Sequence, residues 1–101
     1  MSSKPETLAG FLFKKGEDRL GLWQGRYFKL DEKNYKLYYF KTQKSSEPQG
    51  SIDLTEITDV TEGRDNDGFD IHTTKRVWHL KVDSKERTKK EWWISNIKQW
   101  V

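Results

Sequence analysis

The 101-residue chain contains no cysteine, two prolines and one methionine. Without cysteine it cannot form a disulfide scaffold or a thiolate zinc site, which is typical of proteins from a reducing compartment. Its two histidines, His72 and His79, are too few to hold a metal ion unaided. We interpret both as ordinary strand residues and expect neither a metal nor a cofactor.

Long apolar runs are also absent. No segment approaches the roughly 20 apolar residues of a membrane-spanning helix. Residues 1–7 lack the apolar core of a secretory signal, and they are interpreted as a flexible tail. Because a chain of this length supports one hydrophobic core, we expect residues 8–101 to form a single domain. Since the sequence lacks cysteine, a secretory signal and a membrane span, we expect this domain to be cytoplasmic.

Apolar residues make up only 33% of the chain and charged residues 35%, a balance that by itself favours disorder. Aromatic residues, at 14%, offset this balance because each buries a large area. The composition therefore predicts a compact domain with an aromatic core.

The charge is unevenly distributed. Residues 1–50 hold ten Lys or Arg against six Asp or Glu, whereas residues 51–101 hold nine against ten. A cationic first half favours an anionic partner, which at this stage is a nucleic acid, an anionic membrane or a phosphorylated ligand.

Short apolar and aromatic stretches separated by polar turns indicate seven β-strands. They cover Leu8–Lys15, Leu22–Leu30, Tyr35–Thr42, Gly50–Leu54, Ile57–Thr61, Phe69–Thr73 and Arg76–Val82. Seven antiparallel strands tend to curl into a barrel with open ends, so the sequence predicts a mainly β fold.

The last stretch of the chain has helical periodicity. Asp83, followed by Glu86, is typical of a helix N-cap with a carboxylate at the third helical position. The apolar positions that then share one helical face are Trp93, Ile97, Trp100 and Val101. We expect this face to cap one end of the barrel, with Trp93 in the core and its neighbour Trp92 partly buried.

Alternation along the first two strands places basic residues on the core face. Leu12 shares its face with Lys14, and Phe28 shares its face with Arg26. Because an unpaired charge is costly in a dry core, these cations are expected at an open mouth beneath the loop of residues 16–21. There they would form an anion site. The alternative is that each is a solvated or edge-protecting residue.

Aromatic and basic residues alternate in Tyr35–Lys41, a pattern compatible with stacking on nucleic-acid bases. However, Leu37, Tyr39 and Lys41 share the parity of the core, and a net charge of +3 is modest for nucleic-acid binding. We therefore expect no nucleic-acid partner. No catalytic constellation or glycine-rich phosphate loop is recognisable, so we do not expect an enzyme.

Apolar residues also lie on or beside the loop that joins the first two strands, next to Arg19. One interpretation is that Leu22 and Trp23 pack against the barrel. The other is that Leu20 and Leu22 enter a bilayer beside the anion site.

Five motifs, in order, resemble those of the pleckstrin-homology (PH) domain family. They are Gly10-Phe-Leu-Phe-Lys14, Trp23-Gln-Gly-Arg-Tyr-Phe-Lys-Leu30, Leu37-Tyr-Tyr-Phe-Lys41, Glu47-Pro-Gln-Gly-Ser-Ile-Asp-Leu54 and Trp93. The resemblance covers Gly10–Val101. It implies a seven-stranded bent antiparallel barrel of two near-orthogonal sheets, capped by one C-terminal α-helix.

The resemblance also implies that a phosphoinositide headgroup binds at the mouth of the barrel. The residues expected to contact the headgroup are Lys14, Lys15, Arg19, Gln24, Arg26 and Tyr39, and the expected membrane contacts are Leu20 and Leu22. Gln24 and Gln49 stand where stronger or more selective members carry a basic residue, which predicts weaker binding to phosphate.

We therefore expect a non-catalytic membrane-targeting module that associates peripherally with the cytosolic leaflet and is monomeric as an isolated domain. The alternative is a module on the same fold that binds a protein or peptide. Gln24 and Gln49 favour this alternative, whereas Lys14, Arg26 and Tyr39 favour lipid.

Overall fold

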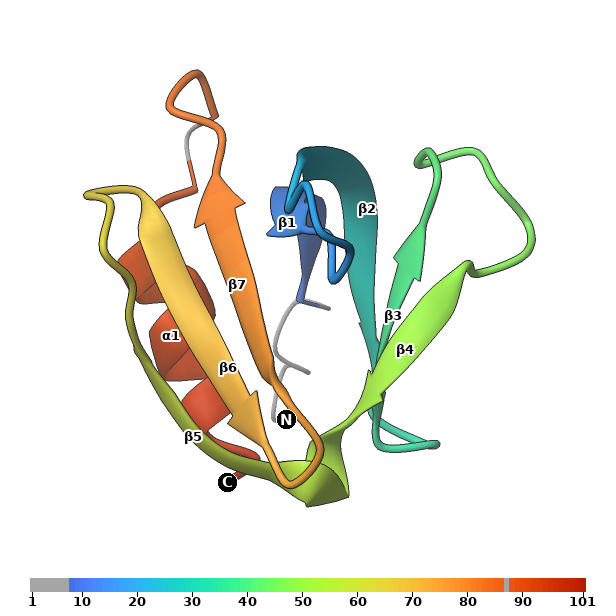
Figure 1. The fold of residues 1–101 in the computed structure, drawn as a ribbon. Coiled ribbons are helices and arrows are strands. Elements are labelled where there is room, and N and C mark those ends of the chain that lie inside the picture. The colour runs from blue at the N-terminus through green and yellow to red at the C-terminus, as the bar shows by residue number, and fades with distance from the viewer. Residues whose placement is uncertain (1–7, 87) are drawn as a thin grey trace.

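A computed structural model describes residues 8–86 and 88–101 (Figure 1). Its elements are β1 (Ala9–Lys15), β2 (Trp23–Asp31), β3 (Lys36–Phe40), β4 (Gly50–Asp53), η1 (Leu54–Glu56), β5 (Ile57–Glu62), β6 (Gly68–Thr73), β7 (Val77–Val82) and α1 (Lys90–Lys98). The seven predicted strands are confirmed, each boundary to within two residues. The tail predicted for residues 1–7 lies outside the described residues.

All strands pair antiparallel, in the order β4-β3-β2-β1-β7-β6-β5. The β1–β7 pairing is short and joins Leu12–Lys14 to Leu80–Val82. It connects two halves of the barrel, so the expected pair of sheets is one continuous bent sheet. The sheet ends at β4 and β5, which are linked through η1 and leave the barrel open on that side (Figure 1).

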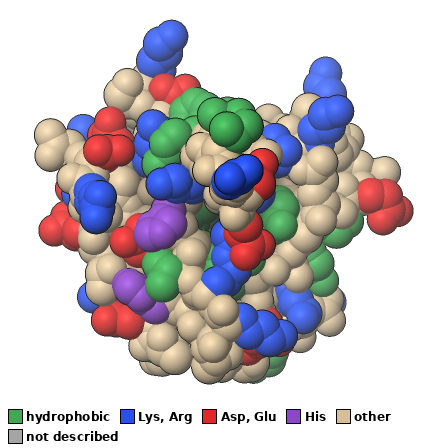
Figure 2. Space-filling view, viewed as in Figure 1, with side chains coloured by type: hydrophobic (Ala, Val, Ile, Leu, Met, Phe, Trp, Pro, Cys, Tyr) green, Lys and Arg blue, Asp and Glu red, His purple; other side chains and the backbone are tan. Residues whose placement is uncertain are grey.

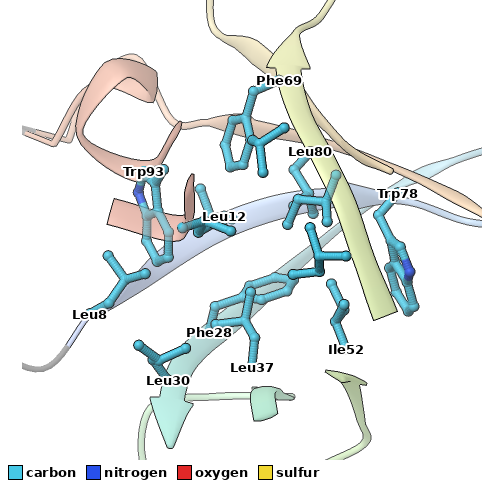
Figure 3. Close-up of a cluster of buried hydrophobic side chains, with 14 of the residues drawn as sticks. Leu8, Leu12, Phe28, Leu30, Leu37, Ile52, Phe69, Trp78, Leu80 and Trp93 are labelled. Carbon is cyan, nitrogen blue, oxygen red and sulfur yellow. The ribbon is translucent and has the colours of Figure 1, made fainter. Parts of the chain in front are cut away.

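The core fills the space between the bent sheet and α1 (Figure 3). Twelve of its sixteen buried residues are Leu, Ile or Val. The four buried aromatics are Phe28, Phe69, Trp78 and Trp93, and the last two lie on opposite sides of the cluster (Figure 3). The prediction of an aromatic core was therefore only partly right, because strand alternation directs many of the other aromatics outward.

The helix begins at Lys90, so the prediction of an N-cap at Asp83 was wrong. The Asp83 carboxylate instead accepts a hydrogen bond of 3.0 Å from the Lys85 backbone N–H, and its carbonyl accepts one of 2.9 Å from Glu86. These bonds close an isolated turn. The six residues from Ser84 to Lys89 are all polar. A helix there would have no apolar side chain to pack on the core, so α1 begins only one turn before Trp93, which is buried.

Within α1, Trp93 and Ile97 are buried and Trp92 is half-buried, as predicted. The helix ends at Lys98. Trp100, just beyond its end, is partly buried and packs against the core as predicted, whereas Val101 is 58% exposed. Among the described residues, no helix combines the length and apolar character needed to span a bilayer.

Candidate anion-binding site at the open mouth of the barrel

The pairing of β1 with β2 brings three polar side chains to the inner face of the sheet. Lys14 pairs with Gln24, and Arg26 pairs with Leu12, which is fully buried. Since directly paired residues share a face, Lys14, Gln24 and Arg26 lie on the core side of the sheet. All three are only half-buried, because the sheet opens toward solvent here. The predicted parity of these strands is confirmed.

Tyr39 of β3 contributes an aromatic wall to the mouth. Its ring centroid lies 5.8 Å from that of Trp78 in β7, and a Cβ on Gly50 would collide with the Tyr39 hydroxyl. The ring is thus fitted against the backbone of β4. The Lys14 Nζ lies 5.1 Å from the Tyr39 ring centroid and 5.8 Å from that of Trp78, within the range of a cation–π interaction.

Arg76, at the β6–β7 turn, adds a third cation that the sequence analysis missed. Its guanidinium lies 3.8 Å from the Trp78 ring centroid. Its Nη1 lies 2.5 Å from a carboxylate oxygen of Glu17 in the β1–β2 loop. Arg76 shares strand parity with Trp78 and Leu80, both buried, so the alternation that identified Arg26 also identifies Arg76.

The pKa of Lys14 reflects both its burial and the closeness of the other two cations. Partial burial, and then the nearby charges of Arg76 and Arg26, lower the pKa of Lys14 below its ordinary value, while Glu17 acts in the opposite direction. A bound anion would relieve the repulsion among the three cations. The mouth is therefore electrostatically suited to an anion.

Arg26 retains hydrogen-bonding capacity. Its Nη1 donates a 2.7 Å bond to the carbonyl of Gly25. Its Nε is buried and has no hydrogen-bond partner among the described residues. A buried donor without a partner is costly, so a phosphate oxygen reaching this guanidinium would be favourable.

Four other residues considered in the sequence analysis lie outside this inner face of the sheet. Lys15 lies on the opposite face of β1, paired with Trp23. Arg19 is exposed on the β1–β2 loop, and Gln49 is exposed just before β4. Lys41, predicted to face the core, lies beyond the end of β3 and is exposed, because the strand stops at Phe40.

The β1–β2 loop projects apolar side chains into solvent. Leu20 is 75% exposed and Leu22 is 60% exposed, so packing of Leu22 against the barrel is not observed. Gly21 has a φ of +55°, and its N–H donates to the backbone carbonyl and carboxylate of Asp18. This tight turn displays Leu20 at its tip. Over this loop, hydrophobic side chains lie next to those of Lys or Arg (Figure 2).

The histidines take part in ordinary strand contacts. His72 Nε2 lies 2.8 Å from the hydroxyl oxygen of Thr61, and His79 Nδ1 lies 2.8 Å from a carboxylate oxygen of Asp70. Across residues 8–86 and 88–101, no group of three or more His, Asp or Glu side chains is placed to hold a metal ion.

An open, bent β-barrel with three cations and two aromatic rings at its mouth is the architecture of a small interaction module. The PH domain family model matches residues 7–101, and the chain belongs to the PH domain family. Domains of this family generally serve as non-catalytic interaction modules.

One curated relative and two solved structures illustrate the similarity. The chain is 31% identical over 104 residues to human TBC1 domain family member 2A, covering 99% of this chain and 11% of that protein. The solution structure of the PH domain of human TBC1 domain family member 2 has a TM-score of 0.81 at 29% identity, covering 99% of this chain and 84% of that one.

The crystal structure of the C-terminal PH domain of pleckstrin in complex with D-myo-Ins(1,2,3,4,5)P5 has a TM-score of 0.73 at 30% identity. The match covers 91% of this chain and 94% of that one. This chain is therefore similar throughout to a domain crystallised with an inositol phosphate. It spans only about a tenth of the curated TBC1 relative, so the similarity concerns this domain alone.

Proposed function

We propose that the domain binds the phosphorylated inositol headgroup of a phosphoinositide at the open mouth of the barrel, and so attaches to the cytosolic leaflet of a membrane. Lys14 and Arg26 bind phosphate groups, and Gln24 donates a neutral hydrogen bond. The Tyr39 ring holds Lys14 in place through a cation–π contact. Arg76 adds a third cation from the β6–β7 turn. Arg19 reaches anionic lipid from the exposed loop.

The observation that carries this proposal is the convergence of Lys14, Arg26 and Arg76. These cations come from three separate parts of the chain. Partial burial, and then the charges of Arg76 and Arg26, lower the pKa of Lys14. Charge-assisted bonds to phosphate are about twice as strong as neutral ones. The similarity to a pleckstrin PH domain crystallised with an inositol pentakisphosphate supports the same ligand class.

The second candidate function is recognition of a protein or peptide on the same fold. Gln24, the direct cross-strand partner of Lys14, is neutral, and Glu17 already occupies Arg76. Both features weaken phosphate binding. The two functions are distinguished by sedimentation with vesicles that contain or lack phosphoinositide, because only the proposed function requires the headgroup.

Replacement of Arg26 tests the site directly. Arg26→Ala removes a charge-assisted contact worth about 1.5 kcal/mol or more, so affinity for a soluble inositol polyphosphate should fall about tenfold or more. Titration calorimetry measures this affinity, and circular dichroism checks the fold. The matched control is Arg64→Ala, which removes an exposed arginine from the loop between β5 and β6 and should leave affinity nearly unchanged. Equal affinities of Arg26→Ala and the wild type would contradict the site.

A further inference from the structure

The outer face of the sheet carries an unusual concentration of aromatic side chains. Cross-strand pairing aligns Phe40, Tyr27 and Phe11 in one row across β3, β2 and β1. We call the following set the aromatic face: Phe11, Phe13, Trp23, Tyr27, Tyr38 and Phe40. An antiparallel sheet with one face on the core normally presents polar residues on its other face.

The rings of this face pack on one another and on the sheet, yet they remain accessible. Phe11 packs edge-on against Phe13, with ring centroids 5.1 Å apart. Its ring also lies directly over Gly25, where an added Cβ would come within 2.5 Å of the ring. Phe11 is 36% exposed and Trp23 is 37% exposed. Large contiguous apolar patches on a soluble domain commonly mark interaction sites.

The border of the aromatic face is cationic. Four lysines surround it, and none has a carboxylate within 4 Å among the described residues: Lys15, Lys29, Lys41 and Lys81. The Lys81 Nζ lies 4.4 Å from the Trp23 ring centroid, so it is positioned by a cation–π contact. The Asp31 carboxylate, at the end of β2, is bonded to Asn34. Apolar contact and positive charge are therefore presented together.

A hollow adjoins the aromatic row. It has a volume of about 450 Å³ and is lined by Phe11, Tyr27 and the start of the β3–β4 loop, including Lys41. Glu86, on the segment before α1, also lines it. The hollow is large enough for one apolar anchor side chain, and an acidic group beside that anchor would meet Lys41.

We propose that the aromatic face docks an acidic amphipathic segment of a partner protein. Apolar side chains of the segment cover Phe11 and Tyr27, and its carboxylates meet the lysine border. Charge complementarity selects this occupant. A second copy of the chain would oppose lysine border to lysine border, which is repulsive.

A bilayer fits the aromatic face less well than a protein segment does. The face runs along the strands, and Lys29 lies six residues after Trp23 along β2, a distance of about 20 Å. A membrane that engages the β1–β2 loop touches only the end of the face nearest the loop. The rest remains free, so the partner segment and a headgroup at the mouth can bind together. This inference goes beyond the proposed function and does not require it.

The test begins with a displayed library of random 12-residue peptides selected against the wild-type domain. The expected result is enrichment of sequences that combine Asp or Glu with aromatic or large aliphatic residues. NMR chemical-shift changes from a selected peptide should map to β1–β2–β3. Enrichment of basic or purely polar sequences, or shifts confined to the mouth, would overturn the proposal.

Variants then locate the contact. Phe11→Ser should weaken the selected peptide at least tenfold, whereas the matched control Tyr35→Ser, an exposed aromatic outside the face, should not. Lys29→Glu keeps every aromatic residue and should also weaken the peptide, which keeps the test valid if Phe11→Ser folds poorly. Unchanged affinity in Lys29→Glu would overturn the proposal.

Two further measurements test the two other possible occupants of the aromatic face, a membrane and a second copy of the chain. Binding of Phe11→Ser to vesicles of phosphatidylcholine, phosphatidylserine and phosphoinositide should equal that of the wild type, and a loss would assign the face to the membrane. Sedimentation velocity should show a wild-type monomer. A dimer that Phe11→Ser dissociates would assign the face to a second copy. Arg26→Ala should weaken headgroup binding about tenfold or more and spare the peptide, so failure of either proposal is recognised separately.

Discussion

At the scale of the residue, Lys14 carries a positive charge that its surroundings in the folded protein disfavour. Its ammonium group is half-buried, lies beside two aromatic rings and shares the mouth with Arg26 and Arg76. Its lowered pKa means that the folded protein holds this proton less tightly than the unfolded chain does. Folding stability therefore rises with pH between the lowered pKa and the ordinary value of 10.5.

Headgroup binding should depend on pH in the opposite direction. A bound phosphate favours the charged form of Lys14, so binding takes up a proton and affinity falls as pH rises through the lowered pKa. Calorimetry with a soluble inositol phosphate in buffers of different ionisation enthalpy, from neutral pH to about pH 10, measures both effects. Lys14→Arg is the control because its guanidinium does not titrate there, and its affinity should stay level. The same alkaline fall in Lys14→Arg would assign the titration to another group.

The sequence predicts most of the inner face of the mouth. Parity with buried neighbours correctly places Lys14, Gln24 and Arg26, and the same argument applied to the last strand places Arg76. The Glu17 contact could not be predicted in this way. Glu17 lies in a loop, where side-chain direction follows from turn geometry rather than from a two-residue repeat.

At the scale of the element, local and tertiary signals differ in how well they predict structure. The strands are predictable because each alternates between core and solvent and ends at a polar or glycine-containing turn. The start of the helix is not, because the capping pattern from Asp83 to Glu86 is a local signal. Forming a helix there would need apolar contacts that the intervening residues lack.

The contact between Glu17 and Arg76 joins the β1–β2 loop to the β6–β7 turn, directly at the mouth. Glu17 is 68% exposed at the side chain and Arg76 is 22% exposed, so the pair contributes little stability, on the order of 0–1 kcal/mol. The Glu17 carboxylate, however, pairs with Arg76, a cation that would otherwise be available to phosphate. Glu17→Gln should therefore tighten binding of a soluble inositol phosphate severalfold, with thermal stability almost unchanged.

Two controls define what the Glu17→Gln result means. Asp18→Asn removes a loop carboxylate that bonds to the Gly21 N–H, and it should give a smaller gain in affinity. In an Arg76→Ala background, Glu17→Gln should lose most of its effect, because the competition involves that pair. A gain that persists without Arg76 would show that Glu17 acts only through its overall charge.

At the scale of the whole molecule, the structure separates two surfaces that the charge distribution of the sequence does not distinguish. The mouth opens where the β1–β2 loop and the β6–β7 turn meet, whereas the aromatic face lies along the strands. Lysine and arginine of the cationic first half contribute to both surfaces. Composition could indicate an anionic partner, but only the register of β1, β2, β3 and β7 shows which cations lie together.

The arrangement also predicts how membrane binding divides between charge and apolar contact. Cations near the surface attract anionic lipid by roughly 1 kcal/mol each, and salt screens that attraction. Leu20, 75% exposed beside the mouth, would instead bury apolar area worth about 1.5–3 kcal/mol at most, with little dependence on salt.

Leu20→Ser should therefore weaken binding to phosphoinositide vesicles about tenfold or more and leave affinity for the soluble headgroup unchanged, whereas Arg26→Ala weakens both. Vesicle sedimentation at low and high salt, paired with calorimetry on the soluble headgroup, makes the comparison. Tyr35→Ser is the control, because Tyr35 lies at the β2–β3 turn, at the opposite end of β2 from the loop. If Leu20→Ser binds vesicles as the wild type does, the loop stays out of the bilayer and the attachment is electrostatic alone.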